Sequence, residues 1–466
     1  MKRIIVANDL VGVGKVALSA SIPLMASCLL EQVLLPTCLL SSHTGGGQNP
    51  VKHTTSSILD VFLTDWDNKR IKFDGIFIGY FTTTRDGQKL LEWLSRKQLP
   101  LILDPIMADN GKLYQGFSQK HIEIMIKLTQ KAELVLPNIS EACLLTQTAY
   151  LAKNYDEEDI RQVARKLAKL GPKQVVISGI SFEEGSIGFA YYQSDSDQLT
   201  FHFGKQFPYH FYGTGDIASA IITAGFYYQL PLTQILDLVV SFLEKVLQNT
   251  LTLKRDLILG VAYESHLNYL TKSFKKLLEE KMSSQKLANY IELSMYAALI
   301  FISVQVLRIP VGMQFIHLGN ALVVIAVLIY GSKKGALVAS LGLGIFDVLN
   351  GYASVVWITI LESLAICLIL HLVYERAMQS SKKPKAIITI TVIAALSKLT
   401  INLIKYLLLA YIGTQLPLSV SFWVALGKIG GSFGTSFVTL VAVPLLYPVI
   451  KNLKEKVTIG QAKRGF

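Results

Sequence analysis

The clearest chemical signal in this sequence is the run Gly213-Thr214-Gly215-Asp216, which stands directly before an apolar helical stretch at 217–227. Glycines leave room for main-chain N–H groups around an anion, and a helix N-terminus adds the positive end of its dipole. An aspartate beside such an anion hole can take a proton from a substrate hydroxyl while a phosphoryl group arrives. The run therefore predicts a small-molecule kinase, with Asp216 as the base and Gly213, Thr214 and Gly215 as the anion hole.

A second chemical motif is the pair Asn138 and Glu141, which follows an apolar run at 134–137. An amide and a carboxylate three residues apart at a helix start can face one site and help to hold a Mg²⁺–water–phosphate cluster. The same spacing is also typical of a capping box, in which both side chains only satisfy the helix terminus. Because the anion-hole run occurs in the same chain, we favour the metal-linked interpretation.

The elements that must position these residues alternate in type through the first 270 residues. Short buried strands are predicted at 3–7, 33–40, 76–78, 101–104, 134–137 and 175–178, and helices at 16–30, 87–96, 120–130 and 157–170. Such alternation predicts a mostly parallel sheet with helices on both faces, whose ligands bind at the carboxyl ends of the strands. Polar or glycine residues follow all six strands: Asn8-Asp9, Ser42 to Gly45, Gly79-Tyr80, Asp104, Asn138 and Ser178-Gly179. We therefore expect the ligand site at this edge.

One glycine-rich turn has two interpretations. The run Gly12-Val13-Gly14-Lys15-Val16 looks like the end of a phosphate-binding G-x-x-x-x-G-K-[ST] loop, but Asp9 and Val16 occupy two of its required positions. That loop is therefore rejected. What remains is a turn near the substrate, or an ordinary strand-to-helix turn.

Together these motifs resemble the ribokinase superfamily, and within it the pyridoxal and pyridoxamine kinases, over residues 1 to about 270. The motifs that carry the resemblance are Asn8-Asp9 with Gly12 to Lys15, Ser42-His43-Thr44-Gly45, Gly79-Tyr80-Phe81, Asp104 to Tyr114, Pro137 to Ala142, and Gly213 to Asp216. The resemblance implies an α/β ribokinase-like sandwich that uses ATP and Mg²⁺. Hydroxymethylpyrimidine kinases are similar enough to remain an alternative.

The resemblance also implies roles for single residues. Asp216 would deprotonate the 5′-hydroxymethyl oxygen of a vitamin B6 vitamer. The vitamer would contact Asp9, His43, Thr44, Gly45 and Tyr80. The residues on the ATP side would be Asn138, Glu141, Ser178 and Gly179. Glu141 and Asp104 are the candidates on the metal side.

Composition separates two halves of the 466 residues. Hydrophobic residues make up 51%, and the formal charge is +12. Many C-terminal Lys and Arg stand beside apolar spans, which indicates membrane orientation, and no aromatic-basic platform for nucleic acid is present. The four cysteines show no C-x-x-C pairing, so reduced structural thiols are expected, in keeping with a cytosolic first half.

The last third predicts a membrane bundle of about six helices, after a linker at 271–286. The predicted spans within 287–466 are 288–307, 316–330, 335–349, 355–374, 386–412 and 420–450, the last with a break at Pro444. Basic loops at 332–334, 375–385 and 451–464 alternate with uncharged loops at 310–314, 350–353 and 414–419. Basic loops stay inside, so both the C-terminus and the kinase half are expected in the cytoplasm of a multi-pass plasma-membrane protein.

Ionisable side chains occur inside these spans: Asp347, Glu362, Lys398, Lys405 and Lys428. Such groups are unfavourable in lipid and normally face a cavity or a partner. Lys398, Asn402 and Lys405 share one helix face. Snorkelling or ion pairing is the plainer interpretation of the lysines, and an interfacial aromatic belt is the plainer one for Tyr352 and Trp357.

The membrane half resembles the substrate-binding (S) component of an energy-coupling factor (ECF) vitamin transporter. The six-span layout, Ile316 to Asn320, and Gly342-x-Gly344 leading to Asp347 and Gly351-Tyr352 carry the resemblance. It implies a bilayer location and a coupling protein with two ATPases as partners in trans. Docking would use the small residues Ser294, Ala297 and Ala298 of the first helix. The vitamin-binding candidates are Asn320, Asp347, Asn350, Tyr352, Trp357, Lys398 and Asn402.

The combined hypothesis is vitamin B6 uptake coupled to phosphorylation, since phosphate adds charge that traps the vitamin inside. Two alternatives remain open. One is a hydroxymethylpyrimidine kinase fused to a thiamin-precursor S component, and the other is a kinase-like sensor on a transporter.

Overall fold

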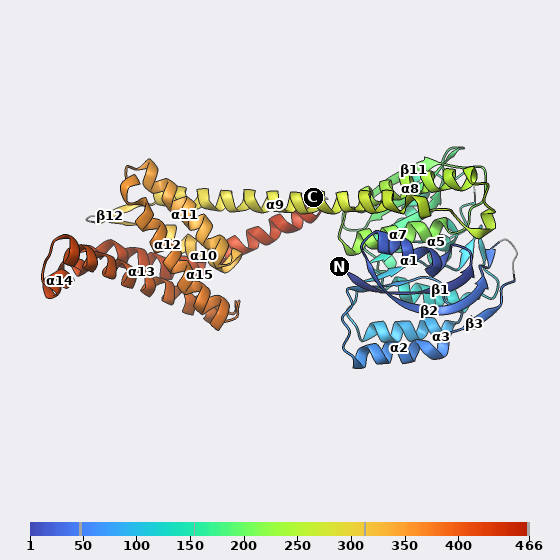
Figure 1. Cartoon of the computed structure of the whole chain (residues 1–466), viewed down its shortest axis with the longest axis horizontal. Coiled ribbons are helices and arrows are strands. Elements are labelled where there is room, and N and C mark those ends of the chain that lie inside the picture. The colour runs from blue at the N-terminus through green and yellow to red at the C-terminus, as the bar shows by residue number, and fades with distance from the viewer. Residues whose placement is uncertain (46–48, 153, 312–313, 464–466) are drawn as a thin grey trace. The chain divides into compact units, whose positions relative to one another are not determined.

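The computed structural model describes residues 1–45, 49–152, 154–311 and 314–463. The chain forms two compact units, Met1–Met282 and Ser283–Phe466 (Figure 1). Each unit is described by itself.

Unit 1 is built on a nine-stranded sheet with the order β11-β10-β9-β8-β5-β4-β1-β2-β3. The six predicted strands form its parallel centre: β1 (Arg3–Val13), β2 (Glu31–Ser42), β4 (Gly75–Ile78), β5 (Leu101–Leu103), β8 (Leu134–Val135) and β9 (Gln174–Ile180). Antiparallel strands close both edges: β3 (Lys52–Thr54) on one side, β10 (Ser186–Gln193) and β11 (Gln198–Lys205) on the other. A separate two-stranded sheet pairs β6 (Ala108–Asp109) with β7 (Lys112–Leu113).

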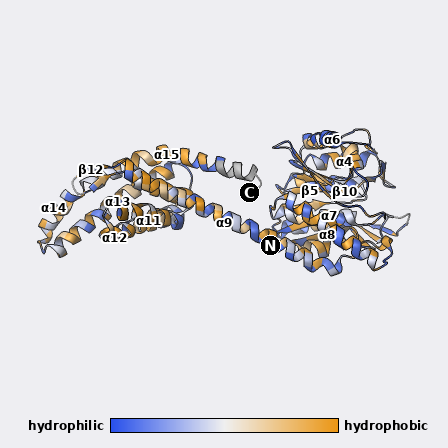
Figure 2. Ribbon diagram, turned by 90° about the horizontal axis from the view of Figure 1, so that it is seen from above, coloured by the Kyte–Doolittle hydropathy of each residue, from blue (hydrophilic) through white to orange (hydrophobic). Residues whose placement is uncertain are grey.

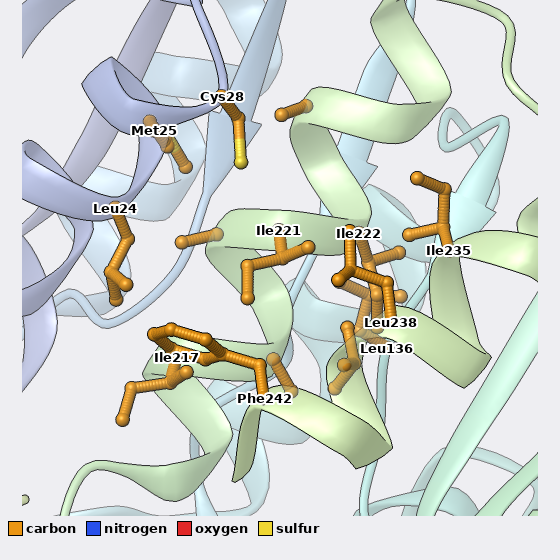
Figure 3. Close-up of a cluster of buried hydrophobic side chains, with 14 of the residues drawn as sticks. Leu24, Met25, Cys28, Leu136, Ile217, Ile221, Ile222, Ile235, Leu238 and Phe242 are labelled. Carbon is orange, nitrogen blue, oxygen red and sulfur yellow. The ribbon is translucent and has the colours of Figure 1, made fainter. Parts of the chain in front are cut away.

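Helices cover both faces of this sheet because successive strand residues point to opposite sides. Ile4 and Val6 of β1 join one core, whereas Ile5 and Ala7 join the other. The first core lies under α1 (Ala17–Ser27), α7 (Thr214–Tyr227) and α8 (Leu232–Thr252), and Figure 3 shows their apolar side chains converging. The second lies under α2 (Ser56–Asn68), α3 (Thr84–Ser95), α4 (Gln119–Thr129), α5 (Ile139–Leu145) and α6 (Glu157–Leu170).

The predicted linker at 271–286 is helical, because it lies inside α9 (Leu267–Val306). Leu270 and Phe274, one helical turn apart, are fully buried in the first core of unit 1. Lys281 donates to the main-chain oxygens of Tyr228 and Gln229, each at 2.8 Å. Buried apolar residues and the Lys281 hydrogen bonds therefore fix the first part of the predicted linker on unit 1.

Unit 2 is helical apart from a small hairpin of β12 (Ile309–Val311) and β13 (Gln314–Ile316). After α9 follow α10 (Gly319–Tyr330), α11 (Ser332–Leu349), α12 (Val356–Leu370), α13 (Pro384–Gly413), α14 (Leu418–Lys428) and α15 (Gly430–Lys463). A π-helical turn, His371–Ala377, extends α12. Figure 2 shows hydrophobic residues along much of these helices.

The helix lengths support fewer long membrane spans than the six predicted. Within the described residues, four helices are long and apolar enough to cross a membrane: Glu264–Val306, Ala353–Ala377, Pro384–Gly413 and Gly430–Lys456. The apolar helix α10 has only 12 residues, and those from Gly319 to Leu328 are all buried, so it packs inside the bundle. The last predicted span breaks at Ile429 between α14 and α15 rather than at Pro444, which lies within α15.

Candidate functional site

The N-terminus of α7 is shaped by Gly213. This residue has φ +84°, in the left-handed region, and a Cβ there would lie 2.3 Å from the carbonyl oxygen of Lys15. Only glycine fits both conditions. The predicted turn around Gly12–Val16 therefore packs directly against the anion-hole run, which favours its interpretation as a turn of the site. Thr214 and Gly215 begin the helix, and space beside Gly215 is open.

Three aspartates from different elements meet near this helix start. Asp9 belongs to β1, Asp104 follows β5, and Asp216 lies in the first turn of α7. Burial raises the pKa of Asp216 to about 6, although the main-chain N–H of Ala17 donates to its carboxylate and opposes the shift. Burial, and then repulsion by Asp216, raises the pKa of Asp9 to about 7.

Asp104 shows the same effects of burial and of repulsion by Asp216. Its side chain is buried, and the hydroxyl of Ser219 on α7 donates to its Oδ2 at 2.6 Å. Burial is the largest cause, and repulsion by Asp216 adds to it, so that the pKa of Asp104 rises to about 7. A set of close carboxyl groups with raised pKa values at strand ends is typical of an active site.

On the predicted vitamer side, Tyr80 is held by its neighbours. Asn8 Oδ1 accepts from the main-chain N–H groups of Tyr80 at 2.8 Å and Asp9 at 3.0 Å, so one amide fixes both residues. Lys52 of β3 donates to the Tyr80 hydroxyl at 3.0 Å, and its ammonium lies 5.4 Å from the ring centre. Sequence reasoning missed Lys52, because only the antiparallel pairing of β3 with β2 returns it to this edge.

Both ring nitrogens of His43, a predicted vitamer contact, form hydrogen bonds with main-chain groups. Nδ1 accepts from the N–H of Gly45 at 3.0 Å, so Nε2 carries the proton and donates to the carbonyl oxygen of Ile258 in a short hydrogen bond. The buried imidazole therefore anchors its own loop. Gly45 packs under the ring of Tyr212, where a Cβ would lie 2.4 Å from a ring carbon, and Thr44 is exposed.

The pair Asn138 and Glu141 forms the capping box that was the plainer interpretation. Asn138 Oδ1 accepts from the Glu141 N–H at 2.9 Å, and Glu141 Oε2 accepts from the Asn138 N–H at 2.9 Å. Glu141 Oε1 accepts from Met107 N at 3.1 Å. The buried carboxylate thus ties α5 to the loop after β5, and the geometry favours this anchoring role over direct metal coordination. Burial, and secondarily Asp104, raises its pKa well above the usual value.

On the predicted ATP side, Asn138 forms a bridge with Ser178 of β9, whose N–H donates to Pro137 O at 2.9 Å. The next residue, Gly179, has φ +76° and open space around it. These main-chain groups line the same strand edge as Asn138.

The residues present fit Mg²⁺ only as part of a larger complex. Among the described residues, no group of three or more His, Cys, Asp or Glu side chains could hold a metal ion by itself. Mg²⁺ is usually held by one or two carboxylates together with substrate phosphates and water. Asp104, with one oxygen bonded to Ser219, is the side chain here that fits such a ligand set.

In unit 2, one ion cluster joins two helices. Glu362 of α12 accepts from Lys398 at 2.7 Å and from Lys405 at 2.5 Å, both on α13. Asp347 of α11 lies near enough to interact electrostatically with all three groups. Asn402 lies on α13 between the two lysines.

Three buried polar side chains of unit 2 carry an atom that lacks a partner. In the part of the chain that the structure describes, no hydrogen bond reaches Asn320 Nδ2, Asp347 Oδ2 or Asn402 Oδ1. All three residues are at least nine-tenths buried, and Asn320 lies on α10, which packs against α11 and α12. Unsatisfied buried polar atoms are unfavourable, so a polar ligand at this cluster would remove that penalty.

Three predicted vitamin-binding residues do not join the cluster, because α11 ends at Leu349 and they follow it. Asn350 bonds Arg308 at 3.2 Å and Gln305 at 2.9 Å. Tyr352 packs edge-on to Phe315, and Trp357 is 59% exposed with its Nε1 donating to Ser354 O. Exposed aromatic side chains fit the alternative of an interfacial belt.

The predicted docking face of α9 is only partly free. A Cβ on Gly342 of α11 would lie 2.7 Å from the main-chain oxygen of Ala297, so that position packs inside unit 2. Ala297 is 5% exposed. Ser294 and Ala298, by contrast, are exposed and remain candidates.

Two family models match the chain, one in each unit. Residues 44–259 match the phosphomethylpyrimidine kinase family, and residues 283–454 match the ECF-type riboflavin transporter S component. The chain joins a pyridoxal-kinase-like domain to an S-component-like membrane region.

Individual proteins similar to the kinase-like domain are pyridoxal or phosphomethylpyrimidine kinases. The pyridoxal kinase of Arabidopsis thaliana is 27% identical over 194 residues, 40% of this chain and 61% of that protein. The chain spans little more than 60% of the curated relatives it matches.

Solved structures cover the domain more fully. Pyridoxal kinase of Lactobacillus plantarum is 29% identical with TM-score 0.54, over 58% of this chain and 96% of that one. A Bacteroides thetaiotaomicron protein, provisionally described as a phosphomethylpyrimidine kinase and crystallised with pyridoxal, is 26% identical with TM-score 0.55, over 58% and 95%. The Leishmania donovani pyridoxal kinase, solved with ADP and pyridoxamine, is 18% identical with TM-score 0.52 over 58% and 96%, and shows the shared fold alone.

Proposed function

We propose that this chain captures a vitamin B6 vitamer through its S-component-like region and phosphorylates the 5′-hydroxymethyl group with its kinase-like domain. The observation that carries the proposal is the position of Asp216 in the first turn of α7, beside Gly213 and near Asp9 and Asp104. A proton acceptor and an anion-binding helix N-terminus are the two parts that phosphoryl transfer to a hydroxyl requires.

In the proposed reaction, Asp216 takes the proton of the vitamer hydroxyl as that oxygen bonds to the γ-phosphorus of ATP. The bond from the γ-phosphorus to the β,γ-bridging oxygen breaks, and ADP leaves. The N–H groups at the start of α7 face the charge that develops on the phosphoryl oxygens. Asp9 and Tyr80 hold the vitamer ring, while Asn138, Ser178 and Gly179 lie on the ATP side. Asp104 would help to hold Mg²⁺, which neutralises phosphate charge when bound.

Capture of the vitamin is assigned to the polar cluster of the membrane region. Asn320, Asp347, Lys398 and Asn402 offer donors and acceptors there, and three of them carry unpartnered buried atoms. A hydroxylated pyridine, which has both donors and acceptors, matches such a site. Release to the cytoplasm would require an ECF coupling protein and two ATPases in trans, with Ser294 and Ala298 on the docking face.

The proposed orientation places the basic end of the membrane region in the cytoplasm. Lys334 bonds Asn289 at 2.7 Å, Lys454 approaches Glu292 at 3.4 Å, and Ser332 bonds Glu375, so the basic loops meet at one end. Arg308, just after α9, lies 16 residues beyond Glu292 and 19 beyond Asn289, which is roughly 25 Å along an α-helix, and it bonds Asn350 at that other end. Positive charge stays inside, so the kinase-like domain would share the side on which ATP is found.

The test is ATP-dependent phosphorylation by the detergent-purified chain, with pyridoxal, pyridoxine, pyridoxamine and hydroxymethylpyrimidine offered side by side. Turnover of a pyridine vitamer well above that of the pyrimidine supports the proposal. No turnover of any of them, by a chain that still binds a vitamer, would leave the kinase-like domain as a sensor.

A second candidate function is hydroxymethylpyrimidine phosphorylation in a thiamin-precursor uptake protein. The match of residues 44–259 to the phosphomethylpyrimidine kinase family favours it. Preference for the pyrimidine in the same assay would select this alternative.

A further inference from the structure

Lys52 is an amine at the vitamer side of the kinase-like site that neither the motifs nor the proposed reaction uses. It lies on β3 at the sheet edge, where lysine is often present only to prevent strands of other molecules from pairing. An edge lysine with that role extends into solvent. The Lys52 side chain is exposed as well, but its ammonium donates to the hydroxyl of the buried Tyr80 at 3.0 Å.

Lys52 is linked electrostatically, through Asp9, to the proposed base Asp216. Its charge acts on Asp9, and Asp9 in turn interacts with Asp216. Within the described residues, no carboxylate lies within 4.0 Å of the Lys52 ammonium, whereas Lys69, for example, pairs with Asp65 at 2.8 Å. The ammonium therefore keeps donor capacity beside Asp9 and Tyr80.

The two candidate substrates differ in the groups that such a donor would meet. Pyridoxal and hydroxymethylpyrimidine share the hydroxymethyl group that accepts phosphate. Next to it, pyridoxal carries a carbonyl oxygen and then a phenolic oxygen, which are acceptors. Hydroxymethylpyrimidine carries an amino group at the first of these positions, which is a donor. Pyridoxamine carries a cationic aminomethyl group there.

We propose that Lys52 is a specificity-determining residue, whose ammonium donates to the carbonyl and phenolic oxygens of a 3-hydroxypyridine aldehyde and disfavours an amino group at the same place. Tyr80 orients the ammonium, and Asp9 holds the far part of the ring. The inference rests on the proposed vitamin B6 kinase function and names its preferred substrate class as the aldehyde vitamer.

The test compares Lys52→Met with Lys52→Arg and wild type in the full detergent-purified chain. A hydrogen bond to a charged group contributes a factor of about 10 to 100 in binding. Lys52→Met is expected to lower kcat/KM for pyridoxal, relative to that for hydroxymethylpyrimidine, by this factor, while Lys52→Arg retains most of the preference. Lys69→Met, on the exposed end of α2, is the matched control and should leave the ratio unchanged.

Binding of pyridoxal and hydroxymethylpyrimidine without ATP, measured by calorimetry on the same variants, separates this inference from the proposed function. The membrane region is identical in all of them, so differences report the kinase-like domain. An unchanged ratio of affinities in Lys52→Met overturns the role of Lys52. If the ratio of affinities changes but wild type shows no turnover, the specificity role of Lys52 is supported and the proposed kinase activity is contradicted.

Discussion

At the scale of single residues, the proposed phosphoryl transfer depends on how the protein sets the proton affinity of Asp216. A base is most effective when its pKa lies near the working pH. Burial raises the pKa of Asp216 to about 6, while the N–H of Ala17 limits the shift. The carboxylate is therefore mostly ionised at neutral pH but more basic than an exposed aspartate.

Replacement of Asp216 tests its proposed role as the proton acceptor. Asp216→Asn keeps the size of the side chain but removes proton acceptance, so we expect kcat to fall by about 10² to 10⁴-fold. Vitamin binding by the membrane region should not change, because Asp216 belongs to unit 1. Phosphorylation assays and equilibrium binding on the same preparation check both statements. Full activity of the variant would contradict the assignment of the base.

The pH dependence of the reaction follows from the same pKa. Below about pH 6 Asp216 is protonated and cannot accept the hydroxyl proton, so kcat/KM should fall as the pH decreases from 7 to 5. At higher pH, kcat/KM should reach a plateau because the carboxylate is then fully ionised. A kcat/KM profile that stays flat from pH 5 to 7 would be incompatible with a buried carboxyl base.

At the scale of elements, the site depends on a contact between the start of α7 and the turn before α1. Gly213 makes this contact possible, because its left-handed φ and its approach to Lys15 O exclude a side chain. Glu141 does the same for α5, whose N-terminus it ties to the loop after β5. Both residues contact main-chain atoms of segments distant in sequence.

Two glycines of one motif give a matched pair of variants for this contact. Gly213→Ala should destabilise the kinase-like domain by about 1–3 kcal/mol, because a strained φ and a main-chain clash act together. Gly215→Ala meets open space and should change stability by less than about 0.5 kcal/mol. Thermal unfolding followed by tryptophan fluorescence measures both. Equal melting temperatures for the two variants would argue against the close packing.

At the scale of the whole molecule, each unit contains polar groups that only long-range contacts satisfy. In the membrane region, Glu362 is the common partner of Lys398 and Lys405. Removing one member of a buried ion cluster leaves unpaired charge, which is more unfavourable than never having had the pair. The cluster therefore holds α12 and α13 together and also shapes the proposed vitamin site.

Glu362→Gln should accordingly destabilise the membrane region by about 3–5 kcal/mol. The matched control is Glu455→Gln, which removes an exposed pair with Lys451 at 3.7 Å and should change stability by less than about 1 kcal/mol. Thermal unfolding in one detergent compares the two. Adding Lys398→Met to Glu362→Gln should recover part of the loss, and a Glu362→Gln variant as stable as Glu455→Gln would refute the structural role.

The sequence alone predicts the mostly parallel sheet with helices on both faces and the apolar helical region that follows it, and the structure confirms both. The division at 271–286 and the anion-hole role of Gly213, Thr214 and Gly215 stay predictions. These are local properties: apolar runs define strands, and glycine spacing defines a turn before a helix. The edge hairpin of β10 and β11 was not predicted, and neither was the packing of α10 inside the bundle. Their patterns do not differ from those of other apolar runs, and only neighbouring elements decide their position.

Which candidate side chains are available to a ligand follows from the packing of the elements. The polar atoms of His43 and Glu141 form hydrogen bonds with main-chain groups, and Ala297 packs beside Gly342. Lys52 reaches Tyr80 only because β3 folds back along β2. Sequence spacing reports which residues share an element, but hydrogen-bond partners between distant segments depend on how the elements pack.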